Sequence, residues 1–318
     1  MTFFKRYKLW IPIFVVFSVV LPFISDSGFF HHLLVMIGIN IILVISLDML
    51  LGHVGLISLG HAGFMGLGAY TCVLLVMKLN APFLCGLLGG MALAGLFGAL
   101  IGYPSLRLRG HYFVIVTFIV GIILNLLFNN LIEITKGPMG IPGIPPAEIG
   151  IKGLFSLRFT SKLSYYYLVL VFIFISLGIK YRCYESKMGK ALIAIREDEA
   201  LAKSIGIHTH AYKVGIFTIS TSVAGIAGGL HAHYFHFIGP DSFAMLHSFD
   251  LFVMNLLGGA GTTAGPIVGP VVLTVINEVS ELFKPAFGRI FFGLILILII
   301  LYMPKGIMGF WRRLLGKR

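Results

Sequence analysis

The chain has few charged residues. Only 11% of its 318 residues are charged, whereas 58% are hydrophobic, compared with about 25% charged and 45–50% apolar residues in a soluble domain. A water-soluble globular protein is therefore excluded.

Apolar runs of about 20 residues, long enough to cross a bilayer core, recur along the chain with short polar breaks. We expect an all-α, polytopic integral membrane protein with eight to ten transmembrane helices and Gly-rich broken segments, forming one domain over residues 1–318. The expected spans are 9–25, 30–51, 58–77, 83–102, 113–132, 164–181, 213–234, a broken region 249–283, and 289–304. The first of them lacks a small-residue cleavage site and is expected to be retained as a helix.

Cysteine and catalytic motifs are also scarce. The three cysteines, Cys72, Cys85 and Cys183, are an odd number without metal-ligand spacing, which argues against disulfides and redox chemistry. His231, His233 and His236 do not converge on one helical face, so no metal is expected. The two Gly-Lys pairs lack the following Ser or Thr of a phosphate-binding loop, and neither His-Glu-x-x-His nor Gly-x-Ser-x-Gly occurs. We expect a protein that is not an enzyme and holds no cofactor, with any ATP hydrolysis carried out by another chain.

Acidic residues are half as frequent as basic ones. There are 12 against 24, for a net charge of +12, and such an excess can indicate nucleic-acid binding. If the N-terminus is cytoplasmic, however, 17 of the 24 basic residues fall in internal segments at 5–8, 107–109, 180–213 and 305–318. The positive-inside rule therefore explains the excess, favours cytoplasmic N- and C-termini, and removes the need for a nucleic-acid partner.

Two connections between spans are long. The segment 133–163 contains KGPMGIPGIPP and is expected to face outward, either as a rigid, irregular cap or as a simple connector. The segment 184–213 is expected to face the cytoplasm.

The segment 184–213 has the pattern of an amphipathic helix or helix pair. Apolar residues recur mainly three and four apart, and Gly206 follows as a helix stop; these residues are Met188, Leu192, Ile195, Ala202 and Ile205. The apolar stripe must cover the membrane surface, the chain's own helix ends or another protein. The acidic run 197–199 would be repelled by anionic lipid, so we expect a protein partner.

Two glycine clusters interrupt apolar runs, one within 50–71 and one within 255–272. Non-helical backbone at membrane depth must be covered by protein or line a cavity. Paired Gly- and Pro-interrupted segments in the two halves of a transporter point to its path, although small residues also allow close helix packing. Both interpretations stay open and are compatible. The candidate path or hinge residues are Gly60, His61, Gly63, Gly258, Gly259, Gly261, Gly265 and Pro266.

Two acidic residues lie within apolar runs. Asp48 and Glu278 would suggest proton coupling if either lay at the midplane of the bilayer. Each lies near the end of its expected span, which favours side chains that reach toward water.

Six motifs in order carry a family resemblance over residues 50–270. They are GHVGLISLGHAGFMGLGAY, YPSLRLRGHYFVIVTF, KGPMGIPGIP, SKMGKALIAIREDEALAKSIGIHTHAYKVGIFTIS, GGLHAHYFHFIGPDSF and GGAGTTAGPIVG. With these motifs the chain resembles the LivM branch of the branched-chain amino acid ABC transporter permeases. His111 departs from the pattern, since similar sequences carry an acidic residue there.

The resemblance implies a role for the segment 184–213. In ABC importers a short cytoplasmic helix of the permease seats in a groove of the ATPase. The residues that match this coupling element are Gly189, Ala191, Ile195, Arg196, Glu197, Ala200 and Gly206. The resemblance further implies a second permease subunit, two ABC ATPase subunits and a periplasmic substrate-binding protein that meets the outward segments 133–163 and 235–247.

The resulting hypothesis is a permease subunit in the inner membrane of a bacterium. It would line part of an alternating-access path for a neutral aliphatic, branched-chain amino acid. An ion-coupled secondary transporter and an ABC permease for urea or short amides are the alternatives. A membrane enzyme is a third class, and no catalytic constellation in the sequence supports it.

Overall fold

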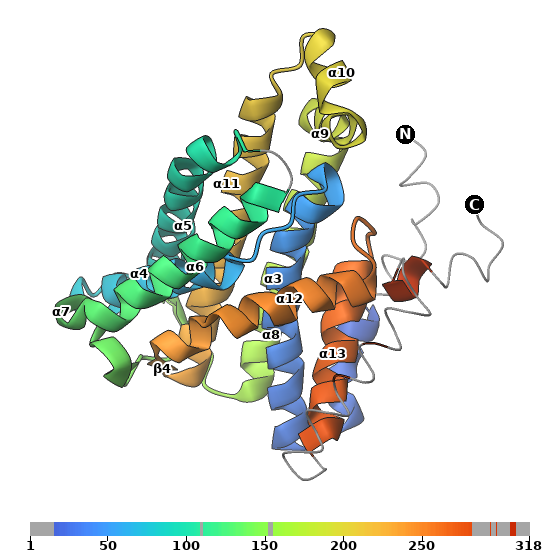
Figure 1. Cartoon of the computed structure of the whole chain (residues 1–318). Helices are drawn as coiled ribbons and strands as arrows, with labels where there is room; N and C mark the ends of the chain where they lie inside the picture. The colour runs from blue at the N-terminus through green and yellow to red at the C-terminus, as the bar shows by residue number, and fades with distance from the viewer. Residues whose placement is uncertain are drawn as a thin grey trace.

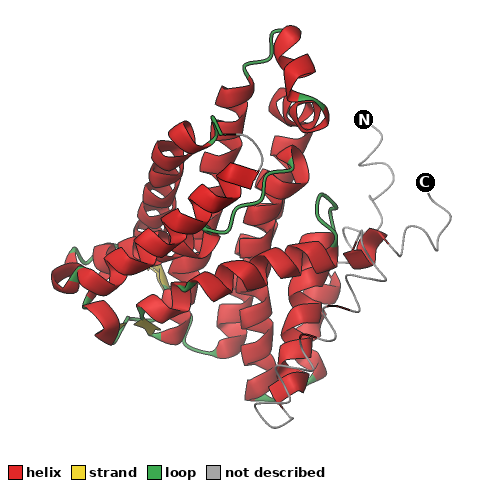
Figure 2. Ribbon diagram, viewed as in Figure 1, coloured by secondary structure: helices red, strands yellow, loops and turns green. Residues whose placement is uncertain are grey.

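The computed structural model describes residues 16–108, 111–151 and 155–281, together with residues 293, 297 and 306–309. Within this part of the chain, six helices are long and apolar enough to cross a membrane (Figures 1 and 2). They are α3 (Gly28–Val54), α4 (His61–Lys78), α5 (Phe83–Ser105), α6 (His111–Asn130), α8 (Lys162–Glu185) and α11 (Thr209–Phe235). The all-α, polytopic prediction is confirmed. The first part of the expected span 9–25 and almost all of 289–304 lie outside the described residues.

Helix α3 forms the centre of the bundle. Almost every residue from Leu34 to Val54 is buried, because α3 packs against α8, α11 and the later helices α12 and α13. A helix that is apolar on all sides is expected at such a position. The core of the molecule is therefore organised around the second expected span.

Glycines bring α4, α5 and α11 into backbone contact. A Cβ atom on Gly68 of α4 would overlap the backbone of Gly225 on α11, and one on Gly90 of α5 would overlap the carbonyl of Gly68. Small residues allow such close approach where lipid supplies no hydrophobic drive for helix association. The packing interpretation of the first glycine cluster thus has direct geometric support.

The expected broken region 249–283 consists of two helices. α12 (Met245–Gly258) has 14 residues and α13 (Gly265–Glu281) has 17, so each is shorter than the roughly 20 residues of a standard span. Residues 259–264 join them, and α13 packs along α3. The interruption predicted from the glycines is therefore present.

The segment 133–163 is more regular than expected. Its backbone forms α7 (Ile132–Thr135), η2 (Gly137–Met139), β1 (Ile141–Pro142), β2 (Glu148–Ile151) and β3 (Phe155–Arg158). β2 and β3 form an antiparallel hairpin, while β1 pairs with β4 (Phe237–Ile238), which follows α11. The hairpin follows the Pro- and Gly-rich stretch 136–146, which itself forms only η2 and the two-residue β1, so the irregular backbone expected for the segment is limited to part of it. The remaining short elements are η1 (Leu21–Ile24) and η3 (Pro240–Phe243).

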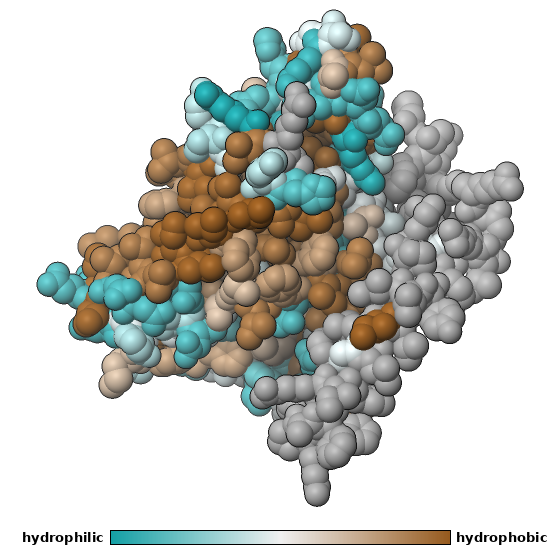
Figure 3. Space-filling view, viewed as in Figure 1, coloured by the Kyte–Doolittle hydropathy of each residue, from teal (hydrophilic) through white to brown (hydrophobic). Residues whose placement is uncertain are grey.

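The outer surface has an apolar band. Figure 3 shows hydrophobic side chains gathered over α6 and α12, between hydrophilic regions at the two ends of the bundle. On α6 the exposed large apolar residues are Tyr112, Ile115, Ile119, Ile122, Ile123, Leu126 and Leu127. Such a band is what a bilayer around the middle of the bundle requires.

Candidate coupling helices and glycine-rich breaks

The segment 184–213 folds as the predicted helix pair. α9 (Lys187–Glu197) begins at Ser186, whose Oγ accepts a hydrogen bond from the N–H of Gly189 at 3.2 Å. α10 (Glu199–Ser204) begins at Asp198, whose Oδ1 accepts from two N–H groups of the first turn. Ser and Asp are preferred N-caps because their oxygens satisfy otherwise unpaired donors. Gly206 follows α10 with a φ of +85°, which agrees with its predicted role as a helix stop.

The apolar stripe of α9 faces the chain itself. Leu192 and Ile195 are buried and belong to the hydrophobic core, since α9 packs on α3, α8 and α11. The expectation that this stripe docks on a separate protein was wrong for α9. The helix ends of the same chain cover it, and an intramolecular contact avoids the entropy cost of association.

The coupling candidates fall on two sides of the helix pair. Gly189, Ala191 and Ile195 are buried, and a Cβ on Gly189 would overlap the carbonyl groups at the end of α8. The exposed candidates are Arg196, Glu197, Ala200 and Gly206.

The exposed apolar surface of this region lies on α10 and its C-cap. Leu201 is 63% exposed and Ile205 is 68% exposed. Neither was among the coupling candidates, although Ile205 belonged to the predicted stripe. The face that α10 offers to another molecule is therefore centred on Leu201 and Ile205.

A cluster of charges fixes α10 to the start of α11. Glu199 Oε1 lies 2.9 Å from Lys213 Nζ and 3.1 Å from Lys203 Nζ, and it accepts a hydrogen bond from Thr209. Burial alone would raise the pKa of Glu199, but the hydrogen bonds from the two lysines and from Thr209 lower that pKa to about 2. The carboxylate is therefore ionised throughout the physiological range.

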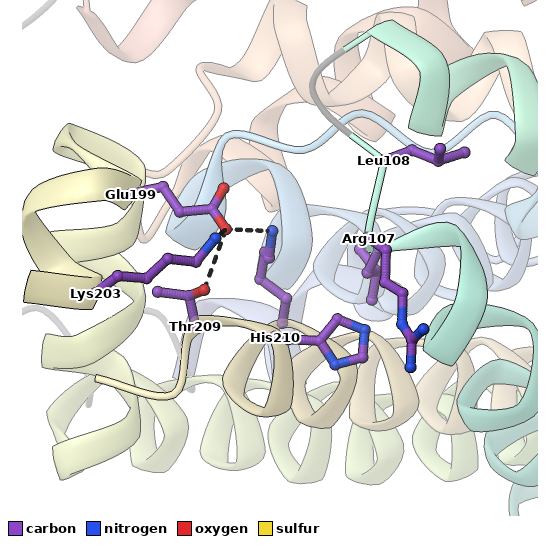
Figure 4. Close-up of a pocket in the computed structure, with 8 residues that line it drawn as sticks. Arg107, Leu108, Glu199, Lys203, Thr209 and His210 are labelled. Atoms are coloured by element: carbon purple, nitrogen blue, oxygen red, sulfur yellow. Dashed lines mark hydrogen bonds and ion pairs between the residues drawn. The ribbon is translucent and has the colours of Figure 1, made fainter. Parts of the chain in front are cut away.

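The same cluster borders a cavity of about 340 Å³. Figure 4 shows Glu199, Lys203 and Thr209 on one side of it and Arg107 and Leu108 on the other. The Arg107 guanidinium lies 4.8 Å from the centre of the Tyr103 ring, the geometry of a cation–π contact. The cavity thus separates the α10–α11 connection from the end of α5.

The first glycine cluster contains a break inside the bundle. α3 ends at Val54, Gly55 adopts a φ of +75°, and α4 begins only at His61, so residues 55–60 are not helical. The expected start at residue 58 was therefore three residues too early. A Cβ on Gly60 would overlap the carbonyl oxygen of Thr117 on α6, and one on Gly63 would lie 2.9 Å from Leu124. Within the break Ser58 and Gly60 are buried, so protein covers this part of its backbone.

His61 anchors this break at depth. Its ring nitrogens lie 2.9 Å from Ser58 Oγ and 2.8 Å from Ser220 Oγ, and Ser220 donates to the carbonyl oxygen of Ser46. Ser46 lies eight residues, or roughly 12 Å, before the end of α3. The start of α4 is therefore held well inside the bundle by three serines.

The second break, residues 259–264, joins α12 and α13 through close backbone contacts. A Cβ on Gly258 would overlap the carbonyl of Gly265, and one on Gly265 would overlap that of Gly259. Gly258, Gly259, Gly265 and Pro266 are buried, while Gly261, with a φ of +75°, is exposed. The two sets of path candidates thus lie at separate breaks, one before α4 and one before α13.

Asp48 does not reach water. Its side chain is fully buried, and Oδ2 lies 2.7 Å from Lys180 Nζ. The expectation that Asp48 extends toward solvent was wrong, because an ionic partner on α8 compensates its charge within the protein. Glu278 is half-buried on α13.

Several polar residues at these breaks escaped sequence analysis. From the sequence, Lys180 counts only among the basic residues of the internal segments, and Ser58, Thr117 and Ser220 are not singled out. A basic residue and an acidic residue in two different apolar runs would have pointed to the Asp48–Lys180 pair. Isolated hydroxyls carry no comparable signal, because they also bond to their own helix.

Comparison with known proteins identifies the family. Residues 29–300 match the family described as the branched-chain amino acid transport system permease component. The chain belongs to this permease family. The permease is 32% identical to the high-affinity branched-chain amino acid transport permease LivM of Escherichia coli K12, over 96% of this chain and 76% of that protein. It is 33% identical over the same shares to LivM of Salmonella typhimurium and 25% identical to LivH of that organism, over 84% of the chain and 90% of LivH. No solved structure matches it significantly. The permease is thus a multi-pass membrane transport protein.

Proposed function

We propose that this permease is one of two membrane subunits of a bacterial inner-membrane ABC importer for branched-chain amino acids. Both termini are cytoplasmic in this proposal, the chain crosses the membrane eight to ten times, and the segment 184–213 faces the cytoplasm. A second, LivH-like subunit completes the path. Two ABC ATPases supply the energy, and a periplasmic binding protein delivers the substrate to the outward segments 133–163 and 235–247.

The exposed pair Leu201 and Ile205 is the main structural support for ATPase coupling. These side chains project from a short helix that has its own cap and charge cluster, while α9 beneath it is anchored in the bundle. An exposed apolar pair on a rigid base suits a groove in a partner protein. We assign the ATPase contact to this face of α10 and the exposed candidates Glu197, Ala200 and Gly206, with the buried candidates Gly189, Ala191 and Ile195 supporting it from below.

The two breaks support the transport path. The start of α4 at His61 and the hairpin of α12 and α13 interrupt the bundle where helices can shift without exposing unpaired backbone to lipid. In this proposal Gly60, His61 and Gly63 lie at one break of the path, and Gly258, Gly259, Gly261, Gly265 and Pro266 lie at the other.

The alternative of ion coupling through Asp48 has an observation against it. A proton-binding carboxylate must exchange with water, whereas Asp48 is fully buried and paired with Lys180. A transport competition assay distinguishes a permease for branched-chain amino acids from one for urea or short amides.

The test uses the co-expressed permease pair, ATPases and binding protein in proteoliposomes. We expect uptake of labelled leucine that requires internal ATP and external binding protein and is not reduced by excess urea. The double variant Leu201→Asp and Ile205→Asp should lower ATPase co-purification at least tenfold. The matched control Leu79→Asp, an exposed leucine at the opposite end of the bundle, should keep the ATPases bound. Uptake driven by a proton gradient without ATP, or full ATPase retention by the double variant, would reject the proposal.

A further inference from the structure

The loop 259–264 is bonded to two other elements at one point. Gly261 N–H donates to Asp48 Oδ1 on α3 at 2.7 Å. Lys180 on α8 lies 2.7 Å from the other carboxylate oxygen and donates to the carbonyl oxygen of Thr262 at 2.9 Å. One buried ion pair therefore binds the loop at two consecutive residues, through the amide N–H of Gly261 and the carbonyl oxygen of Thr262.

This ion pair is costly to disturb. Asp48 is fully buried and the Lys180 side chain is 10% exposed, so removal of one partner leaves an uncompensated charge in the protein interior. Such a change is strongly destabilising. Neither residue reaches the exposed face of α10, so the pair stabilises contacts inside the bundle and is not part of that surface.

Helix α9 also contacts the end of α3, next to the loop 259–264. Arg196 Nη1 donates to the carbonyl oxygen of Gly52 at 2.7 Å. Gly52 packs directly on the loop, because a Cβ on Gly52 would lie 2.7 Å from Gly261 Cα. A Cβ on Gly261 would lie 3.6 Å from Arg196 Nη1. The end of α3 and the loop 259–264 thus meet backbone to backbone, and the Arg196 side chain joins the end of α9 to them.

The loop is packed tightly against the helices that it joins. Gly258 packs against the carbonyl of Gly265, and a Cβ on Gly269 of α13 would overlap the carbonyl of Met254 on α12. Thr262 Oγ1 also donates to the carbonyl oxygen of Gly259 and accepts from the N–H of Gly265, so the α12–α13 turn has little room to absorb a displacement. A shift at Gly261 is therefore passed to both helices.

We infer that Asp48, Lys180 and Arg196 are positioning residues that link α9 to the α12–α13 hairpin. Movement of α9 pulls on Gly52 through Arg196, and the Asp48–Lys180 pair holds the loop 259–264 to the same part of α3. The α12–α13 hairpin follows α9 for this reason. The inference rests on the proposed function for its role in transport, but the mechanical link is a property of this chain alone.

The first test measures the link in the purified permease, without any partner. Hydrogen exchange at the amides of residues 259–264 is compared between wild type, Arg196→Gln and the double variant Asp48→Asn with Lys180→Met. The double variant removes both charges together and keeps an acceptor for Gly261 N–H. We expect exchange at least threefold faster in both variants. The matched control Lys190→Gln removes an exposed cation from the same helix and should leave the exchange rates unchanged. Wild-type exchange in both test variants would overturn the inference.

The second test measures transport in the assembled importer. The double variant should reduce leucine uptake per ATP hydrolysed at least fivefold, with the ATPases still bound, because its substitutions lie far from the α10 face. Of the two single variants, Arg196→Lys should keep leucine uptake per ATP hydrolysed closer to the wild-type value than Arg196→Gln. Unchanged uptake per ATP in the double variant would also overturn the inference. A wild-type assembly that takes up no amino acid would instead reject the proposed function and leave the exchange measurement as the decisive test of the link.

Discussion

His61 Nε2 and Ser220 Oγ are 2.8 Å apart although 159 residues separate them in the sequence. Ser220 uses its hydroxyl proton on the carbonyl oxygen of Ser46, so the His61 ring must donate to Ser220 from Nε2–H. In the neutral ring Nδ1 then accepts from the Ser58 hydroxyl at 2.9 Å. The start of α4 is fixed by a directional chain of hydrogen bonds from α3 through α11.

Replacement of His61 by Ala should destabilise the permease. The buried Ser58 hydroxyl loses its acceptor, at a cost of about 1–3 kcal/mol for an unsatisfied group, Ser220 loses the donor from the ring, and a cavity adds to the cost. We expect a lower midpoint of thermal unfolding in detergent at a fixed scan rate. The exposed residue His208 provides the control, since His208→Ala should keep the wild-type midpoint. Equal midpoints for His61→Ala and the wild type would contradict the proposed anchoring.

Gly68→Ala should separate α4 from α11. Its Cβ has no room against the backbone of Gly225, and overpacking of this kind costs about 1–3 kcal/mol. Gly178 on α8 is the matched control, because a Cβ there meets no atom within 4 Å. Gly178→Ala should be neutral or stabilising by up to about 1 kcal/mol, from helix propensity alone. Chemical denaturation of both variants measures the difference, and an equal loss in the two would contradict close packing at Gly68.

Glu199→Gln should loosen the α10–α11 connection in a pH-dependent way. The folded-state pKa of Glu199, about 2, lies below its ordinary value of 4.5, so its stabilising contribution is complete above the ordinary pKa and disappears as the pH falls toward 2. We expect faster amide exchange over residues 199–213 in the variant at neutral pH. The ratio of variant to wild-type exchange rates should approach one between pH 4.5 and 2. A ratio independent of pH would show that the carboxylate charge has no part in holding the connection.

Ile195→Asp should release α9 from the bundle. Ile195 is 5% exposed, and a carboxylate at this position would have no partner, which is costly in the interior. Limited trypsin digestion should cleave the variant faster at the basic residues of α9 and α10. Ile205→Asp, at the exposed position, should show the wild-type digestion rate, and faster cleavage there would mean that α10 depends on that side chain for its fold.

Sequence patterns predicted an element correctly where one physical requirement determines its structure. Long apolar runs predicted the six helices, and the spacing of Leu192 and Ile195 predicted an amphipathic helix, since burial of one face sets that period. Glycine clusters predicted the two breaks. The start of α4 at His61 was placed less well, because the contact that fixes it is with Ser220, far along the chain.

Docking partners were harder to predict than elements. The spacing of an apolar stripe shows that it must be covered but does not show what covers it, so the burial of Ile195 in the chain itself could not be read from its period. The Asp48–Lys180 pair required knowledge that α3 and α8 are neighbours. A helix order along the sequence does not supply this information.

The late start of α4 bears on how the chain enters the membrane. Its span is the least apolar of the six long helices, and just before it the amide of Leu59 donates to the Thr117 hydroxyl on α6 instead of bonding within a helix. During synthesis His61 emerges long before Ser220, its hydrogen-bond partner on α11. The polar contacts at the start of α4 are therefore complete only once α11 has been made.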